Sequence, residues 1–151
     1  MFLTGIFIFC FTIMTAIQLG GSIFAFFDPV SLLIVAGSIF SAIVTTDSLT
    51  DFRMGMKAVL IKDFLMDQSR AERGIIVFGL LNKVSIAAGA LGFLIGLVKL
   101  LARLDDASQI GPAVAVSLTS VFYGTIFGFF LFFPIKRRLE LKRFEQISTV
   151  G

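Results

Sequence analysis

The sequence predicts an all-α integral membrane protein with four transmembrane helices and little mass outside the bilayer. Hydrophobic residues make up 57% of the 151 residues, and most of them lie in four apolar runs. A helix of about 20 mainly apolar residues crosses a bilayer core. Lys136, Arg137 and Arg138 directly follow the last run, as is typical of a membrane boundary. We therefore expect a single membrane domain over residues 1–151.

The first two predicted spans cover about residues 2–19 and 30–46. Gly20, Gly21 and Ser22 end the first span. Asp28-Pro29 then sets the start of the second, because a proline at the first helical position costs no hydrogen bond. These spans are expected to form a tight helical hairpin.

An amphipathic segment, about residues 48–73, follows the second span. Ser48 and Asp51 approximate a capping box, and apolar residues then recur at helical spacing. The other face carries charged side chains, namely Asp51, Arg53, Lys57 and Lys62. Such a helix lies on the membrane surface, against a partner's helices or, more simply, over its own bundle.

The third span is placed at residues 84–101, because a lysine at the bilayer centre costs about 2.5 to 3.5 kcal/mol and both Lys83 and Lys99 then lie near its ends. A short loop with Asp105 and Asp106 leads to Pro112 and to the fourth span, residues 113–134. The remaining residues, 135–151, form a short basic tail.

The distribution of basic residues predicts that both termini are cytoplasmic. Five Lys and Arg lie in residues 47–74 and five more in the tail after Pro134. There are none between the first two spans, and Arg103 is the one between the last two. Lys and Arg accumulate on the cytoplasmic side of membrane proteins.

Several classes of function are excluded by composition. The chain has no histidine and one cysteine, Cys10, so no His/Cys metal site or disulfide is expected within one chain, and neither is a cofactor or enzymatic activity. Basic residues beside apolar runs indicate contact with membrane lipid rather than with nucleic acid. Asp28, Asp105 and Asp106 fall in outer loops, so a proton carrier in the membrane would have to come from another subunit.

Small residues form two stripes on the last two spans. Span three carries Ser85, Gly89, Gly92 and Gly96 along one face, and span four carries Ser117, Ser120, Gly124 and Gly128 at the same spacing. Close backbone approach between small residues drives helix association in lipid. We expect these glycines to pack the two helices together.

Several segments of the membrane region carry a family resemblance. The segment 27–37, FDPVSLLIVAG, resembles the entry to the second helix of MotA-type flagellar stator subunits, and the segments 96–106 and 110–116 resemble their outer turn. Phe122-Tyr123-Gly124 and Phe132-Phe133-Pro134-Ile135 continue the match. Resemblance to the wider MotA, TolQ and ExbB group implies a homo-pentameric ring in the bacterial inner membrane. The ring would enclose two helices of a B-type, MotB-like single-span partner, whose aspartate carries a proton or a sodium ion.

The chain departs from this family pattern at four positions. A proline and three threonines that are usual in the family correspond to Ile86, Phe93, Ser120 and Val121. The resemblance makes Ser120 and Tyr123 candidates for the ion pathway, and Thr119, one residue before Ser120, is a third candidate if the helix is rotated. Ile86, Phe93 and Val121 are candidates for an apolar constriction, which opposes conduction. The family's large cytoplasmic region is reduced to about 27 residues, from Asp47 to Arg73.

Two hypotheses remain. The chain is the MotA-like subunit of an ion-driven stator or motor-type complex, or it is a non-conducting scaffold in a flagellar or envelope complex. Ion conduction, the identity of the ion, the partner, contact with a rotor and rotation are left open by the sequence.

Overall fold

The computed structural model describes residues 2–21, 26–60, 68–102 and 104–150, and every regular element in these ranges is a helix. The prediction of an all-α chain is thus confirmed. The elements are α1 (Phe2–Gly20), α2 (Pro29–Thr45), α3 (Leu49–Leu60), α4 (Gln68–Leu101), α5 (Ala107–Thr125), the π-helix η2 (Ile126–Phe132) and α6 (Phe133–Val150).

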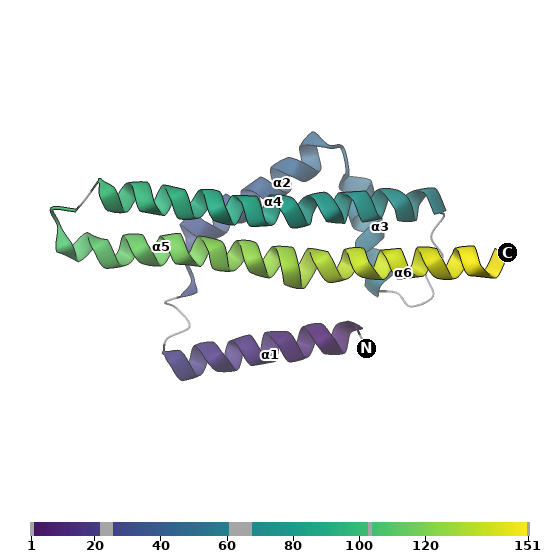
Figure 1. Ribbon diagram of the computed structural model, residues 1–151, viewed down its shortest axis with the longest axis horizontal. Coiled ribbons are helices and arrows are strands. Elements are labelled where there is room, and N and C mark those ends of the chain that lie inside the picture. Colours follow the sequence, from purple (N-terminus) through teal and green to yellow (C-terminus); the bar gives the residue numbers. More distant parts are fainter. Residues whose placement is uncertain (1, 22–25, 61–67, 103, 151) are drawn as a thin grey trace.

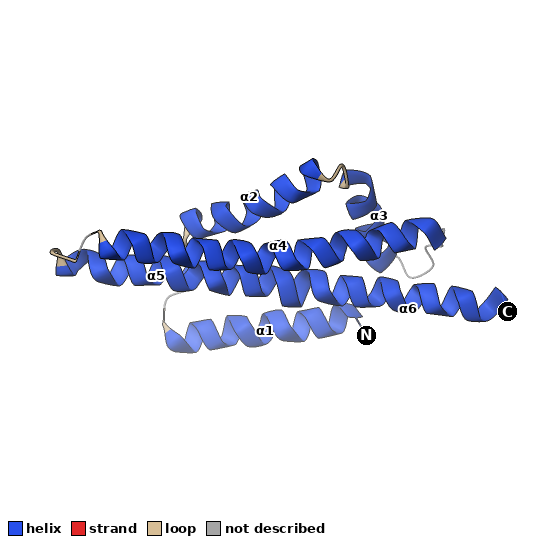
Figure 2. Ribbon diagram, turned by 45° about the horizontal axis from the view of Figure 1, so that its top comes forward, coloured by secondary structure: helices blue, strands red, loops and turns tan. Residues whose placement is uncertain are grey.

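A long antiparallel hairpin forms the body of the molecule. One arm is α4, and the other is the continuous rod of α5, η2 and α6 (Figure 1). Helix α2 lies along one side of this hairpin, and α3 folds back over it near the start of α4 (Figure 2). Helix α1 lies apart from α4 in both views, and its Phe9 ring stacks on that of Phe130 at a centroid distance of 3.5 Å.

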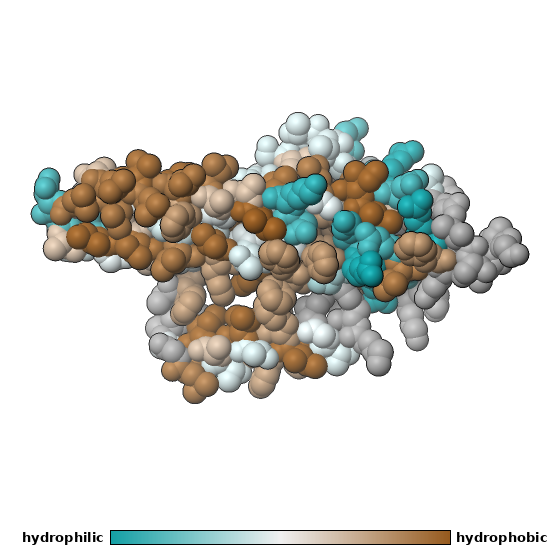
Figure 3. Space-filling model, in the orientation of Figure 1, coloured by the Kyte–Doolittle hydropathy of each residue, from teal (hydrophilic) through white to brown (hydrophobic). Residues whose placement is uncertain are grey.

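Two helical stretches are long and apolar enough to cross a membrane, Ser69–Leu101 and Ala107–Phe144. Helices α2 and α3 provide a third if they count as one span, although the chain bends by 112° between them. The apolar stretch Phe7–Leu19 of α1 is shorter. Apolar side chains also cover much of the surface toward the end with the α4–α5 turn (Figure 3). The chain is therefore a membrane protein with two or three candidate spans by this measure.

The helices of the hairpin are longer than the spans predicted from hydropathy. Helix α4 begins at Gln68 rather than at Val84, because the sequence between them contains no proline to end a helix. Helix α5 begins at Ala107, where the Asp106 carboxylate accepts a hydrogen bond from the backbone N–H of Ser108. Pro112 consequently lies inside the helix rather than at its start.

A π-helical segment joins α5 to α6. The N–H of Phe133 bonds the carbonyl of Gly128, and Pro134, which follows, has no N–H to donate. A proline displaces the carbonyl four residues before it, and a wider turn accommodates that displacement. The second arm therefore continues through Pro134 without a break.

Helix α3 covers its own bundle. Its buried residues, Gly55, Ala58 and Val59, belong to the side that packs on α4 and α6. The predicted capping box is wrong, because the Ser48 hydroxyl is bonded to Thr46 instead of to the first turn of the helix. Residues 61–67 of the predicted amphipathic segment lie outside the described ranges.

Candidate functional site

Glycine lets α4 and α5 approach until their backbones touch. A Cβ added at Gly124 would lie 2.6 Å from the carbonyl oxygen of Ser85 and 2.9 Å from the Cα of Gly89. A Cβ at Gly89 would lie 3.0 Å from the carbonyl oxygen of Ser120. Since these neighbours are backbone atoms, no side-chain rotation could make room. The sequence stripes thus meet in one seam between the two helices.

The remaining small residues continue this seam. A Cβ at Gly96 would overlap the side chain of Ser117, and one at Gly92 would lie 2.5 Å from the hydroxyl oxygen of Ser120. At Gly128 the nearest atom would be Oδ1 of Asn82, at 3.0 Å. The five glycines predicted for helix packing, Gly89, Gly92, Gly96, Gly124 and Gly128, are therefore all placed at close approaches.

Serine hydroxyls are enclosed along the same seam. Ser85, Ser117 and Ser120 are buried, and each lies within hydrogen-bond distance of a carbonyl four residues earlier in its own helix. Such bonds satisfy the hydroxyl within the helix and leave no polar lining for an open channel. The seam in a single protomer is a packed contact.

Helix α2 joins this seam through a serine. The fully buried hydroxyl of Ser31 donates to the carbonyl of Val116 at 3.0 Å, and the Ser120 hydroxyl lies 2.8 Å from it. Ile34 lies 3.7 Å from where a Cβ of Gly92 would be. Three helices therefore meet around Gly92, and a polar bond as well as close packing fixes α2.

Tyr123 anchors the segment that precedes α2. Its hydroxyl donates to the carbonyl of Phe26 at 2.6 Å and accepts from the backbone N–H of Asp28 at 3.3 Å. The Asp28 carboxylate in turn accepts from the N–H of Ser31 as the helix cap. The one tyrosine of the chain thus has partners within its own protomer.

The structure separates the predicted pathway residues from the predicted constriction residues. Thr119 and Ser120 are buried, and Thr119 donates to the carbonyl of Ala115. Ile86 is 40% exposed, Val121 is 41% exposed, and Phe93 is half-buried. Successive helical residues point about 100° apart, so Val121 lies on a different face from Ser120.

An exposed, mainly apolar face therefore runs along the hairpin. On α5 it includes Val114, Leu118 and Val121, which recur at helical spacing. Thr125, four residues after Val121, continues the face and donates its hydroxyl to the carbonyl of Val121. Thr125 was not among the candidates predicted from the sequence, although its four-residue spacing from Val121 indicated that both lie on the same face.

Two other polar residues were missed. Ser31 shares a buried face with Val35, Ile39 and Ile43, and the four-residue spacing among them was the signal. Oδ1 of Asn82 is buried and, among the described residues, lacks a hydrogen-bond partner. An unpaired buried acceptor costs about 1–3 kcal/mol. No pattern in the sequence distinguished it from a boundary residue.

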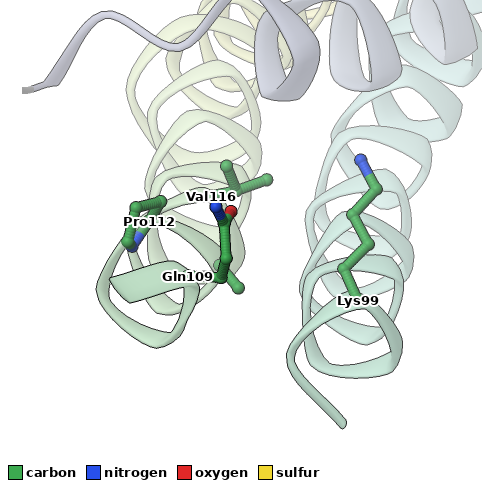
Figure 4. Close-up of a pocket in the computed structure, with 5 residues that line it drawn as sticks. Lys99, Gln109, Pro112 and Val116 are labelled. Carbon is green, nitrogen blue, oxygen red and sulfur yellow. The ribbon is translucent and has the colours of Figure 1, made fainter. Parts of the chain in front are cut away.

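A small pocket of about 280 Å³ opens beside the seam, close to the α4–α5 turn. Lys99 of α4 lines it together with Gln109, Pro112 and Val116 of α5 (Figure 4). Within the described ranges, no group of three or more His, Cys, Asp or Glu residues could hold a metal ion. The seam itself therefore offers packing surfaces and hydroxyls, and Lys99 supplies a charge at the pocket beside it.

Residues 35–150 match the model of the MotA/TolQ/ExbB proton channel family. The chain is also similar to chemotaxis protein PomA of Vibrio alginolyticus, with 40% identity over 91 residues, or 60% of this chain and 36% of that protein. It is also 41% identical to motility protein A of Borreliella burgdorferi over 82 residues, and this matched stretch is 54% of this chain and 32% of that protein. The chain thus matches about a third of the length of these curated relatives.

Proposed function

The chain belongs to the MotA/TolQ/ExbB proton channel family, and we propose that it is a MotA-like membrane subunit of an ion-driven stator or motor-type complex. Five copies surround the transmembrane helices of a MotB-like partner in the bacterial inner membrane. The four spans predicted from the sequence, about residues 2–19, 30–46, 84–101 and 113–134, cross the bilayer as one domain. Both termini lie in the cytoplasm. The proposal is supported by the similarity to proteins named for chemotaxis and motility.

The exposed face of the α4–α5 hairpin carries this proposal. Leu118 is 60% exposed although it lies at the middle of an apolar helix, and Val121, one turn further along α5, is 41% exposed. Apolar side chains next to a seam of backbone contacts suit a rigid wall against which another apolar helix packs. A ring of such hairpins would surround the partner.

The orientation rests on charge and on the path of the chain. Helix α1 begins and α6 ends toward the same end of the molecule (Figure 1). The basic residues near α3 and along α6 gather at that end, which the positive-inside rule places in the cytoplasm. The α4–α5 turn then lies on the outer side.

The mass of the detergent-solubilised complex tests the ring. Native mass spectrometry should show five copies of the chain, with the partner retained when it is co-expressed. A stable monomer would contradict the assembly without contradicting family membership.

Cross-linking tests the face. In a Cys10→Ser background, Leu118→Cys should cross-link to a cysteine placed in the partner's span, because Leu118 lies on the proposed wall. Leu33→Cys, on the exposed side of α2 at 73% exposure, is the matched control and should not cross-link to the partner. The reverse pattern would place the partner against α2.

The apolar constriction favours low conduction and keeps the scaffold as a second candidate. Ile86 and Val121 present no hydroxyl to the exposed face, and a dry constriction opposes ion passage. Proteoliposomes with the chain and its partner should show little proton flux, and Phe93→Thr with Val121→Thr should raise it. Strong flux in the wild-type complex would refute the constriction.

A further inference from the structure

A charged pocket of about 510 Å³ lies at the corner where α2 turns into α3 and passes the first turns of α4. Asp47, Thr50 and Asp51 line it from the corner, and Ser69, Arg70 and Arg73 line it from α4. In Figure 1 this corner lies beside the start of α4, far from the α4–α5 turn. The pocket is separate from the seam and from the exposed face of the hairpin.

No ion pair within 4.0 Å joins the opposite charges of this pocket. Three ion pairs occur among the described residues, and none involves these two aspartates or two arginines. Arg70 is instead directed at the sulfur of Met54, with Nη1 at 3.2 Å. Thioether sulfur is a weak acceptor and leaves the charge of the guanidinium uncompensated. The pocket is partly open, and it carries aspartates on the corner and arginines on α4.

Exposed apolar side chains occur close to the pocket residues in the sequence. Helix α2, an apolar helix, ends at Thr45, directly before the corner. Val44 of α2, Leu49 of α3 and Ile76 of α4 each lie within three residues of a pocket residue in the sequence, and they are 52%, 40% and 66% exposed. A polar pocket beside exposed apolar side chains at the end of a membrane helix suits a lipid, whose headgroup and acyl chains have these two characters.

We propose that this pocket binds the zwitterionic headgroup of a phosphatidylethanolamine-type lipid. The phosphate lies against Arg70 and Arg73, since guanidinium groups bind phosphate oxygens in a fork geometry. The ammonium group, which carries three N–H donors, lies against Asp47 and Asp51. A charged protein segment is the competing occupant, and the exposed apolar side chains of the adjoining helices and the end of the apolar helix α2 favour the lipid.

The test is native mass spectrometry of the purified full chain in detergent, with equimolar phosphatidylethanolamine and phosphatidylglycerol of identical acyl chains. Phosphatidylglycerol shares the phosphate but has no amine. The wild-type protein should retain phosphatidylethanolamine about fivefold more, the ratio expected for one partly exposed charge interaction. Asp51→Asn should make the two lipids equal, and Arg73→Gln should lower the retention of both.

Arg53→Gln is the matched control, because Arg53 is exposed on α3 and does not line the pocket. It should leave the lipid ratio unchanged, and circular dichroism should show the same helix content in all variants. Equal retention of the two lipids by the wild type, or a preference that survives Asp51→Asn, would overturn the proposal. So would binding of soluble phosphoethanolamine as tight as that of the lipid, or retention of a protein segment with neither lipid.

Discussion

The two ends of the α4 hairpin hold their helices together with opposite kinds of residue. At the turn end, where α4 meets α5, Gly89 and Gly124 bring backbone atoms into contact. At the tail end, where α4 meets α3 and α6, large side chains fill the space between the helices. The fully buried ones are Phe78, Leu81, Ile135 and Leu139.

The difference agrees with the proposed placement of the turn end in the bilayer and of the tail end outside it. In lipid, apolar side chains gain little by leaving the acyl chains, so helices associate through close packing and hydrogen bonds. Outside the bilayer, burying apolar surface is the main favourable term. Polar contacts support the same division: Lys142 donates to the carbonyl of Ala58 at 2.8 Å, and Arg143 pairs with Glu72 at 3.0 Å, both at the tail end. One continuous helix pair therefore follows two sets of packing rules.

The largest effect is expected from removing a large side chain at the tail end. Phe78 is fully buried, and its ring lies 5.6 Å from that of Phe52 and 6.2 Å from that of Phe132, centroid to centroid. Phe78→Ala should lower the free energy of unfolding by about 3–5 kcal/mol, through lost burial and the cavity left behind. Unfolding in a denaturing detergent, followed by circular dichroism, measures it.

Phe144→Ala is the control for this change, because Phe144 is 69% exposed at the same end. It should have little effect. Similar losses from both variants would show that the tail end is not held together by its buried aromatic residues.

The next effect is expected from adding one carbon at the turn end. Gly124→Ala places a Cβ 2.6 Å from the carbonyl oxygen of Ser85, so the helices must separate. Overpacking of this kind costs about 1–3 kcal/mol. Gly111→Ala is the same change on the same helix, where a Cβ would meet nothing within 4 Å. The same unfolding measurement should distinguish the two, and equal stability would remove the basis for a tightly packed seam.

The smallest effect is expected from the hydroxyl that joins α2 to the hairpin. Ser120→Ala removes the contact with Ser31 and should cost about 0.6 kcal/mol, the average for hydrogen bonds between membrane helices, and at most about 1.7 kcal/mol. Ser38→Ala is the control, because Ser38 donates only to Ile34 in its own helix. In a double-mutant cycle, Ser31→Ala and Ser120→Ala should be non-additive. Strict additivity would mean that packing alone fixes α2.

Much of the fold was accessible from the sequence, because hydropathy and small-residue spacing act locally along a helix. The apolar runs predicted the helices. The stripes of small residues that contain Gly89 and Gly124 have the same spacing, and this indicated the α4–α5 seam. Helix ends were less accessible. Helix α4 continues to Gln68, well before the apolar boundary at Lys83, because polarity marks the edge of a bilayer and not the end of a helix.

The candidate site was only partly accessible. Thr119, Ser120 and Val121 are adjacent in sequence, and the family resemblance treats them as neighbours in one pathway. Their exposures differ because α2 covers one side of α5 and leaves the other open. Which side a neighbouring helix covers is a long-range property that a single helix does not encode.

By itself, the sequence determined that the protein lies in a membrane and that its small residues form stripes along two helices. Both follow from the chemistry and the spacing of side chains along the chain. The tertiary structure alone decided which distant groups the hydroxyls bond, with Ser31 bonded to Val116 and Tyr123 to Phe26. It also decided that unpaired acids and arginines share one pocket at the α2–α3 corner. These pairings join residues on different helices, and their geometry exists only after the helices have packed.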